Sequence, residues 1–349
     1  MKVTIIGAGN TGLAAACHMT SRGIPVTVYT RHEKLQEIWN KQGITAEGAL
    51  TGHYPLSVTT DLEEAASHAD LFLFTTLAYQ HKEAARMLLP FLHPGQTLLF
   101  YNGCWGALQA YAAYQESSLL SGLTIAETAN MPYIAHLAAG KHSVLIKGIK
   151  NSIFYAVTGN KEKTLAAFLS SLFPEVARMP SFLSTSLGST NPIIHVAASL
   201  FNITRIDNGE DFLFFGPAMT RRCVACMEAA DAERIAVGRA LGTRLPSLLD
   251  TLNSFWPEKK ATLYAALTEN PSYKKSKGPT TLDYRYLSED LPCGIGPIMD
   301  LGQKFNVPTP VTGTLLRAAS LYLDRPYQPF LSPAEMDILT AWQKAMPHR

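Results

Sequence analysis

The chain has 349 residues, which exceeds one ordinary domain and predicts about two. Hydrophobic residues make up 47% and charged residues 17%, so the chain can bury a full core and is not of the disordered class. The net charge is +2, and no run of lysine or arginine indicates a nucleic-acid or lipid surface. We therefore expect neither a nucleic-acid partner nor a membrane partner.

The start of the chain and its cysteines indicate a compartment. Met1 and Lys2 lead directly into an apolar strand, whereas an exported protein needs an apolar segment before its mature part. No uncharged apolar run reaches the roughly 18 residues of a membrane span. The 5 cysteines are odd in number and scattered, which is typical of a reducing environment. We expect a cytoplasmic protein.

The first 100 residues alternate short apolar strands with helices. Continuous apolar strands separated by helices are typical of a parallel sheet that is covered on both faces. The predicted strands are Val3–Ile6, Val26–Tyr29, Leu71–Thr75 and Thr97–Tyr101. The predicted helices are Thr11–Arg22, His32–Gln42, Leu62–Ser67 and Tyr79–Leu89. Further strands at Thr124–Ala126, Val144–Lys147 and Ile153–Thr158 are expected to extend this sheet.

A different pattern begins after Pro174–Pro180, where helical periodicity replaces short strands. A helix is predicted over Ala218–Leu241, and its apolar spacing ends on the C-cap glycine Gly242. Further helices are predicted after Pro292 and over Thr312–Leu323. The fold class is therefore α/β, with a Rossmann-type parallel sheet in residues 1–180 and a mostly helical second domain in residues 181–349.

Two cysteines inside the longest predicted helix form a C-x-x-C pair, Cys223 and Cys226. Neither a second cysteine pair nor a His-x-x-x-His motif accompanies them, so a redox or zinc-binding role is the weaker interpretation. We predict no metal site.

A glycine loop joins the first predicted strand to the first predicted helix. Gly7 allows the tight turn, Gly9 lets the backbone approach a pyrophosphate, and Gly12 permits close packing of helix on strand. The N-terminus of the helix then faces the phosphates. In this context G-x-G-x-x-G predicts a dinucleotide site, with Asn10 and Thr11 as the other cofactor-binding residues of the loop.

The ends of two other predicted strands complete the predicted cofactor site. NAD enzymes carry an acid after the second strand for the ribose 2′-hydroxyl, whereas this chain has Thr30 and Arg31, with no acid before Glu33. Arg31 would attract a 2′-phosphate, and Thr30 could hydrogen-bond it. We therefore predict NADP(H) in preference to NAD(H). Asn102 and Gly103 follow the fourth strand, at the edge of the sheet where such folds bind ligands.

Three residues of the second domain form a candidate catalytic set. His195 lies among apolar residues, and taken alone such a histidine is more often structural. Arg285 and Asp290 stand five positions apart further along the chain. A histidine with a carboxylate to orient it is an acid–base pair, and an arginine is a planar fork for a substrate carboxylate.

Four segments carry a resemblance to a known family. Ser184–Asn202 resembles the opine dehydrogenase family (octopine and nopaline dehydrogenase type), in which this segment runs E-T-S-x-x-N-x-N-x-x-x-H-P-x-x-x-L-L-N. Arg285–Pro292 resembles the family's R-Y-x-x-E-D-V-P segment. Asp231–Arg234 resembles its D-x-E-R helix, and Glu127–Tyr133 its E-T-x-x-x-P-Y/W strand end. The likeness extends in order over roughly residues 1–325.

The resemblance implies an NAD(P)-dependent dehydrogenase that acts on CH–NH bonds. It implies the reductive condensation of an amino acid amine with a 2-oxo acid, through an imine, to an N-(carboxyalkyl) amino acid, and the reverse reaction. The family's acid–base pair carries over onto His195 and Asp290, and its carboxylate-binding arginine onto Arg285. The expected partners are these small-molecule substrates, and a homodimer is compatible with the sequence.

The chain departs from the family pattern at three places. Val196 stands where the family has proline, and Ser184 replaces a glutamate. Ile134–His136 follows the Pro-Tyr pair where the family often has a cysteine and then an arginine. This last segment borders the expected cofactor and substrate site, so the family's usual substrate is not assumed.

Two alternatives stay open at this point. A ketopantoate reductase-like 2-oxo acid reductase would share the glycine loop, the Thr-Arg strand end and the Asn-Gly turn. Such an enzyme would use a catalytic lysine instead of a His–Asp pair. Lys147 or Lys150 could be misread as that lysine. A non-catalytic NADPH-binding sensor would keep the fold and lack the acid–base pair.

Overall fold

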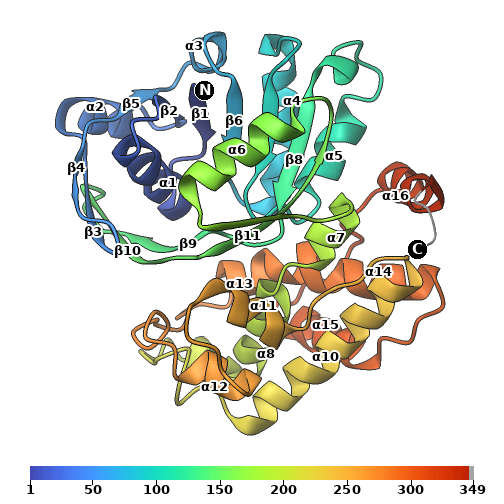
Figure 1. Ribbon diagram of the computed structural model, residues 1–349. Helices are drawn as coiled ribbons and strands as arrows, with labels where there is room; N and C mark the ends of the chain where they lie inside the picture. The colour runs from blue at the N-terminus through green and yellow to red at the C-terminus, as the bar shows by residue number, and fades with distance from the viewer. Residues whose placement is uncertain (346–349) are drawn as a thin grey trace. The chain divides into compact units, whose positions relative to one another are not determined.

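The computed structural model describes residues 1–345, which form two compact units. The first unit is Met1–Thr185, and the second begins at Ser186. In Figure 1 the first unit runs from blue to green and contains both sheets, whereas the second continues to red and is built of helices.

Eight strands form the main sheet of the first unit, in the order β12-β11-β8-β7-β6-β1-β2-β5. They are β1 (Val3–Ile6), β2 (Val26–Tyr29), β5 (Ser57–Thr59), β6 (Leu71–Phe74), β7 (Thr97–Phe100), β8 (Thr124–Thr128), β11 (Ser152–Thr158) and β12 (Glu175–Arg178). Neighbouring strands are parallel except β11 and β8, which are antiparallel. Every residue of β1, β6 and β7 is buried, as in sheets covered on both faces. The predicted Rossmann-type sheet is confirmed.

A second sheet of four strands accompanies it, in the order β4-β3-β10-β9. Its strands are β3 (Ile44–Gly48), β4 (Gly52–Tyr54), β9 (Tyr133–Leu137) and β10 (Ser143–Ile149). The prediction that Val144–Lys147 extends the main sheet is therefore wrong, because β10 pairs with β3 and β9. The cause is that an apolar strand pattern identifies a buried strand but not the sheet to which the strand belongs.

Helix α1 (Asn10–Ser21) lies between the two sheets of the first unit. It packs on β1 and β2 of the main sheet and on β3, β4, β9 and β10 of the second sheet. Contact on two sides explains why its residues from Thr11 to Met19 are all buried. The other helices of this unit are α2 (Glu33–Gln42), α3 (Leu62–Ser67), α4 (His81–Leu88), α5 (Gly106–Ala113) and α6 (Glu162–Leu172), and α7 (Phe182–Leu187) contains the division between the units.

Helices α8 to α16 make up the described part of the second unit. Their bounds are α8 (Asn191–Phe201), α9 (Ile203–Asp207), α10 (Arg221–Ala240), α11 (Leu248–Phe255), α12 (Leu263–Thr268), α13 (Arg285–Ser288), α14 (Gly296–Lys304), α15 (Pro310–Tyr322) and α16 (Pro333–Ala345), with the π-helix η4 (Leu291–Ile295) before α14. The longest, α10, packs on α8, α14 and α15. The predicted mostly helical domain is confirmed.

The D-x-E-R segment of α10 is a structural network. The Arg234 guanidinium is fully buried and pairs with Asp231 at 2.6 Å. It also donates to the backbone carbonyls of Leu187 and Pro246, at 2.8 and 2.7 Å. The Glu233 carboxylate caps α15, because it accepts hydrogen bonds from two backbone N–H groups and one threonine hydroxyl in the first turn of that helix. The motif therefore ties α10 to three other segments of its unit.

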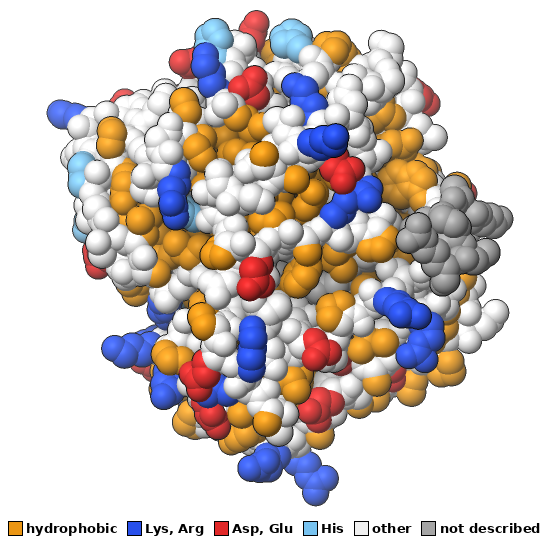
Figure 2. All heavy atoms as spheres, in the orientation of Figure 1, with side chains coloured by type: hydrophobic (Ala, Val, Ile, Leu, Met, Phe, Trp, Pro, Cys, Tyr) orange, Lys and Arg blue, Asp and Glu red, His pale blue; other side chains and the backbone are white. Residues whose placement is uncertain are grey.

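The surface carries charges of both signs. On the face drawn in Figure 2, lysine and arginine side chains are interspersed with aspartate and glutamate side chains. Among the described helices, none combines the length and the apolar character that a membrane crossing requires.

Candidate active site

The glycine loop of the first unit has the geometry of a phosphate cradle. Gly7 has a φ of +115°, in the region that side chains disfavour. A Cβ on Gly12 would collide with the carbonyl oxygen of Gly7, so α1 starts directly against the loop. A Cβ on Gly9, in contrast, would meet nothing within 4 Å. The loop therefore leaves open space at the backbone of Gly9, beside the N-terminus of α1, and fits a dinucleotide pyrophosphate.

The two other predicted loop residues have structural contacts. The Asn10 side-chain oxygen accepts a hydrogen bond of 2.9 Å from the backbone N–H of Leu137 in β9. Asn10 thus joins the glycine loop to the second sheet. Thr11 is buried in the first turn of α1.

Thr30 and Arg31 follow β2 at the same edge of the main sheet. Because Ile6 pairs with Tyr29 in parallel register, Thr30 lies beside the start of the glycine loop. Thr30 is buried, and its hydroxyl accepts from the backbone N–H of His32 at 3.3 Å. Arg31 is exposed, so its guanidinium is accessible to an anion.

The loop after β7 is strained and buried. Asn102, Cys104 and Trp105 all have positive φ, at 53°, 38° and 74°. The Asn102 backbone N–H donates to the Thr128 hydroxyl at 3.0 Å. Such conformations are held only by their surroundings and cluster at functional sites.

Two buried side chains hold this loop, and sequence reasoning assigned neither a role. His81 Nδ1 lies 3.2 Å from the Gly103 carbonyl, and burial lowers the pKa of His81 to about 4. The Glu127 carboxylate is fully buried and accepts from the Ala107 backbone N–H at 3.1 Å and the Thr185 hydroxyl at 2.6 Å. A Cβ on Gly103 would collide with that carboxylate, which accounts for the glycine.

In the second unit, His195 and Asp290 form a buried pair across 95 residues of sequence. The distance from His195 Nδ1 to Asp290 Oδ2 is 2.7 Å. The histidine side chain is 11% exposed and the aspartate 2%. Because an ionised carboxylate only accepts, Nδ1 carries the proton, and Nε2 is the nitrogen left to exchange protons with another molecule.

Two aromatic rings enclose the imidazole. The Tyr286 ring stacks on His195 with a centroid distance of 3.8 Å and an interplanar angle of 22°. Phe214 meets His195 edge-on at 6.2 Å. Tyr286 stands in the R-Y-x-x-E-D segment, but the sequence does not show which partner its ring would face.

Arg285 opens α13, which packs against α8, the helix of His195. Its side chain is 32% exposed, and its Nε lies 3.5 Å from Glu289 Oε2, one turn further on. Burial opposes the charge on Arg285, but the carboxylates of Glu289 and Asp290 raise its pKa above the ordinary value. His195 thus lies on α8, Arg285 on α13 and Asp290 directly before η4, and both α13 and η4 pack against α8.

The departures from the family pattern occupy structural positions. Val196 is fully buried in α8, and its side chain is part of the core. Ser184 is also fully buried, and its hydroxyl lies 3.1 Å from the Ser181 hydroxyl. Ile134–His136 lies in β9, the strand whose next residue is bound by Asn10.

The C-x-x-C pair lies inside α10. Burial raises the pKa of the Cys223 thiol to about 12, which opposes the thiolate that metal binding or redox exchange needs. In the described part of the chain, no group of three or more His, Cys, Asp or Glu residues could hold a metal ion.

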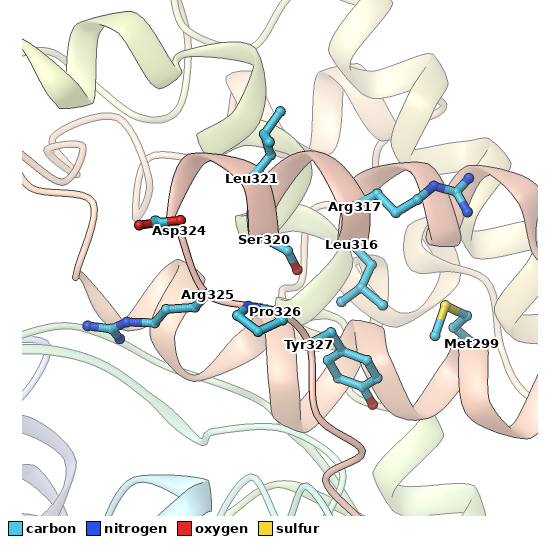
Figure 3. Close-up of a pocket in the computed structure, with 9 residues that line it drawn as sticks. All are labelled: Met299, Leu316, Arg317, Ser320, Leu321, Asp324, Arg325, Pro326 and Tyr327. Atoms are coloured by element: carbon cyan, nitrogen blue, oxygen red, sulfur yellow. The ribbon is translucent and has the colours of Figure 1, made fainter.

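A separate surface cavity of about 460 Å³ lies beside α15 (Figure 3). Its lining includes Leu316, Ser320 and Tyr327, with Arg317 and Arg325 at its sides. None of the predicted site residues lines it.

Two family models match consecutive parts of the chain. Residues 178–323 match the family NAD/NADP octopine/nopaline dehydrogenase, alpha-helical domain. Residues 3–147 match the family ketopantoate reductase PanE/ApbA.

Similar proteins span nearly the whole chain. An opine dehydrogenase of Arthrobacter sp. (strain 1C) is 28% identical over 329 residues, 93% of this chain and 91% of that protein. An octopine dehydrogenase structure with NADH and agmatine has a TM-score of 0.76 at 20% identity, covering 96% of this chain and 91% of its own. Two further octopine dehydrogenase structures, one with NADH and L-arginine and one with NADH and pyruvate, each have a TM-score of 0.74, at 20% and 21% identity. A yersinopine dehydrogenase with bound NADP⁺ has a TM-score of 0.73 at 14% identity, and the match covers 99% of this chain and 98% of that chain.

Proposed function

We propose that the chain is an NAD(P)-dependent dehydrogenase of the opine dehydrogenase type, which acts on CH–NH bonds and joins an amino acid to a 2-oxo acid. The amino nitrogen attacks the 2-oxo carbon, and water leaves to give an imine. The imine is protonated at its nitrogen, which keeps that proton, and NADPH, when bound, would supply the hydride that reduces the imine carbon. The product is an N-(carboxyalkyl) amino acid, and the reverse reaction oxidises it.

In this proposal, residues 1–180 bind the cofactor, and residues 181–349 supply the acid–base chemistry and hold the substrates. The open backbone at Gly9 and the N-terminus of α1 support a pyrophosphate site. The full set of proposed cofactor-binding residues is Gly7, Gly9, Asn10, Thr11, Gly12, Thr30, Arg31, Asn102 and Gly103.

NADP(H) is the proposed cofactor in preference to NAD(H). The buried Thr30 hydroxyl and the exposed Arg31 at the end of β2 support this preference, because Arg31 can pair with a 2′-phosphate. Arg31→Ala should raise the KM for NADPH about tenfold and leave that for NADH unchanged. The exposed Arg22 offers a matched control, Arg22→Ala. An equal change for both cofactors would contradict the preference.

The pair of His195 and Asp290 is the proposed acid–base group, and the 2.7 Å contact between them is the observation that carries the proposal. Imine formation needs a proton removed from the ammonium and a proton given to the departing water. His195 Nε2 can perform both transfers, while Asp290 holds the tautomer and stabilises the imidazolium. Burial of both side chains keeps bulk water from competing.

Arg285 is the proposed carboxylate-binding residue. Its side chain is partly exposed, and its Nε is the atom nearest Glu289, which leaves the two Nη groups to bind a carboxylate in this proposal. A planar guanidinium can hold a 2-oxo acid carboxylate with two parallel hydrogen bonds. The octopine dehydrogenase structures with agmatine, L-arginine and pyruvate support an amine and a 2-oxo acid as the two substrate classes.

The substitution His195→Asn tests the proposed role. It keeps a side chain able to hydrogen-bond but not to titrate, so kcat should fall at least a hundredfold while NADPH binding persists. The exposed histidine His68 supplies the control, His68→Asn, which should retain wild-type kcat. An unchanged kcat in His195→Asn would remove His195 from catalysis.

A ketopantoate reductase-like activity is the second candidate, because the first unit matches that family's model. It would reduce a 2-oxo acid without an amine. The match of residues 178–323 to the octopine/nopaline model and the His195–Asp290 pair favour the opine reaction instead. The sensor alternative would lack this pair.

A further inference from the structure

The imidazole of His195 is constrained at more than one point. Asp290 holds a single atom, Nδ1, and one hydrogen bond leaves the ring free to tilt and swing about that atom. The parallel face of Tyr286, centred 3.8 Å away, opposes that tilt. The combination defines the direction of Nε2, the nitrogen that must meet the substrate.

Tyr286 is itself held by neighbouring rings. Phe214, which is fully buried, lies 4.8 Å from Tyr286 at an angle of 42°. Tyr284 meets it perpendicularly at 4.9 Å. Aromatic pairs in such tilted and edge-on geometries are favourable, so the Tyr286 ring is a fixed surface.

The electrostatics of the stack suit a histidine that changes charge. The face of an aromatic ring carries negative potential and attracts a cation lying over it. Because the Tyr286 ring is nearly parallel to the imidazole, this face is presented to His195 whenever the imidazole gains a proton. Tyr286 and Asp290 therefore both stabilise the protonated imidazole of His195 relative to the neutral imidazole.

We propose that Tyr286 is a positioning residue for His195, whose ring face holds the imidazole plane and stabilises the imidazolium during proton transfer. The proposal rests on the proposed acid–base function of His195. It assigns the effect to the ring of Tyr286 and not to its hydroxyl.

Kinetics of matched variants test the proposal. Tyr286→Leu and Tyr286→Met remove the ring face, and each should lower kcat about tenfold with little change in the Kd of NADPH. Tyr286→Phe keeps the face and should retain kcat within about twofold, a rescue that a role of the hydroxyl would not allow. The methionine variant supplies a second test at similar volume, should the leucine variant fold poorly. Equal losses in the phenylalanine and leucine variants would overturn the proposal.

Proton NMR supplies a readout that does not depend on turnover. The Nδ1 proton bonded to Asp290 should give a downfield signal in the wild type and in Tyr286→Phe. It should broaden or vanish in Tyr286→Leu, because the imidazole swings and exchanges with solvent. Tyr322→Leu, at an exposed tyrosine of α15 outside this aromatic cluster, is the control and should keep the signal.

The two readouts separate failure of this proposal from failure of the proposed function. A signal lost in Tyr286→Leu, from an enzyme that never condenses an amine with a 2-oxo acid, would retain the positioning role and reject the reaction. An unchanged signal and unchanged kcat in Tyr286→Leu would reject the positioning role alone. Combining Tyr286→Leu with Asp290→Asn should lower kcat by less than the product of the single effects, because both act through His195.

Discussion

Gly294 lies so close to the ring of Pro192 that a Cβ on this glycine would collide with the proline side chain. Gly294 belongs to the π-helix η4, which begins one residue after Asp290, and Pro192 stands in the first turn of the helix that carries His195. The missing side chain therefore lets two segments approach closely enough for a 2.7 Å contact between His195 and Asp290. Single π-helical turns of this kind are frequent at functional sites.

Gly294→Ala should separate these two segments. The added methyl group must displace η4 or α8, and a displacement approaching 1 Å at a catalytic group lowers kcat by about a hundredfold. Cofactor binding should persist, because the glycine loop belongs to the other unit. The helical Gly313 supplies the control, since a Cβ there would lie at an ordinary 3.8 Å from Arg317. Wild-type kcat in Gly294→Ala would contradict the geometric argument.

Arg285→Lys should separate charge from shape. Lysine keeps the positive charge but loses the planar fork, so the KM for the 2-oxo acid should rise about tenfold or more while the KM for NADPH stays unchanged. Arg325→Lys is the matched control, because Arg325 is an exposed arginine paired with Asp283. Steady-state kinetics with each substrate varied in turn provide the measurement. A change confined to the KM of the cofactor would show that Arg285 does not bind the oxo acid.

The glycines of the cofactor loop should respond differently to the same substitution. Gly12→Ala places a methyl group against the Gly7 carbonyl and should destabilise the fold by about 1–3 kcal/mol. Gly9→Ala enters open space, so its melting temperature should match the wild type while the Kd for NADPH rises. Calorimetry and cofactor titration measure the two effects. Tight NADPH binding in Gly9→Ala would argue against a pyrophosphate at this backbone.

His81 should make stability depend on pH. Burial lowers its pKa from 6.5 to about 4, so the folded state takes up a proton less readily than the unfolded state. The contribution of neutral His81 to the free energy of unfolding is therefore complete above pH 6.5 and is lost as the pH falls through 4. The free energy lost over this range is about 3 kcal/mol. His18, whose pKa is also lowered to about 4, adds a loss in the same range.

Urea unfolding at pH 7 and pH 4.5 measures this effect of His81. His81→Gln cannot titrate, so the difference in unfolding free energy between the two pH values should be smaller than in the wild type. The exposed histidine His142 gives the control, and His142→Gln should keep the wild-type difference. The same difference in all three proteins would refute the assignment to His81.

The sequence predicted the elements that carry strong local patterns. The continuous apolar runs of β1, β6 and β7 indicated buried parallel strands, and the structure confirms them. β4 and β12 were not predicted, because each is a short strand with mostly exposed residues at the edge of its sheet. Their stability comes from pairing with a neighbouring strand, which no local pattern records.

The candidate site could be predicted only in part. The motifs around His195 and Asp290 suggested a pair, and the structure brings the two side chains together. The stacking of Tyr286 depends on how a four-residue helix packs on α8, which the spacing of residues cannot show. Asn10 was predicted to bind the cofactor, and its contact with the backbone of β9 arises from a sheet that the sequence did not predict.

NADPH oxidation at 340 nm, measured across a matrix of amino acids and 2-oxo acids with each component omitted in turn, tests the central claim most directly. The account predicts oxidation that requires an amine and a 2-oxo acid together, with one N-(carboxyalkyl) amino acid formed for each NADPH consumed. Oxidation at the same rate with a 2-oxo acid alone would contradict reductive condensation and indicate a ketopantoate reductase-like enzyme.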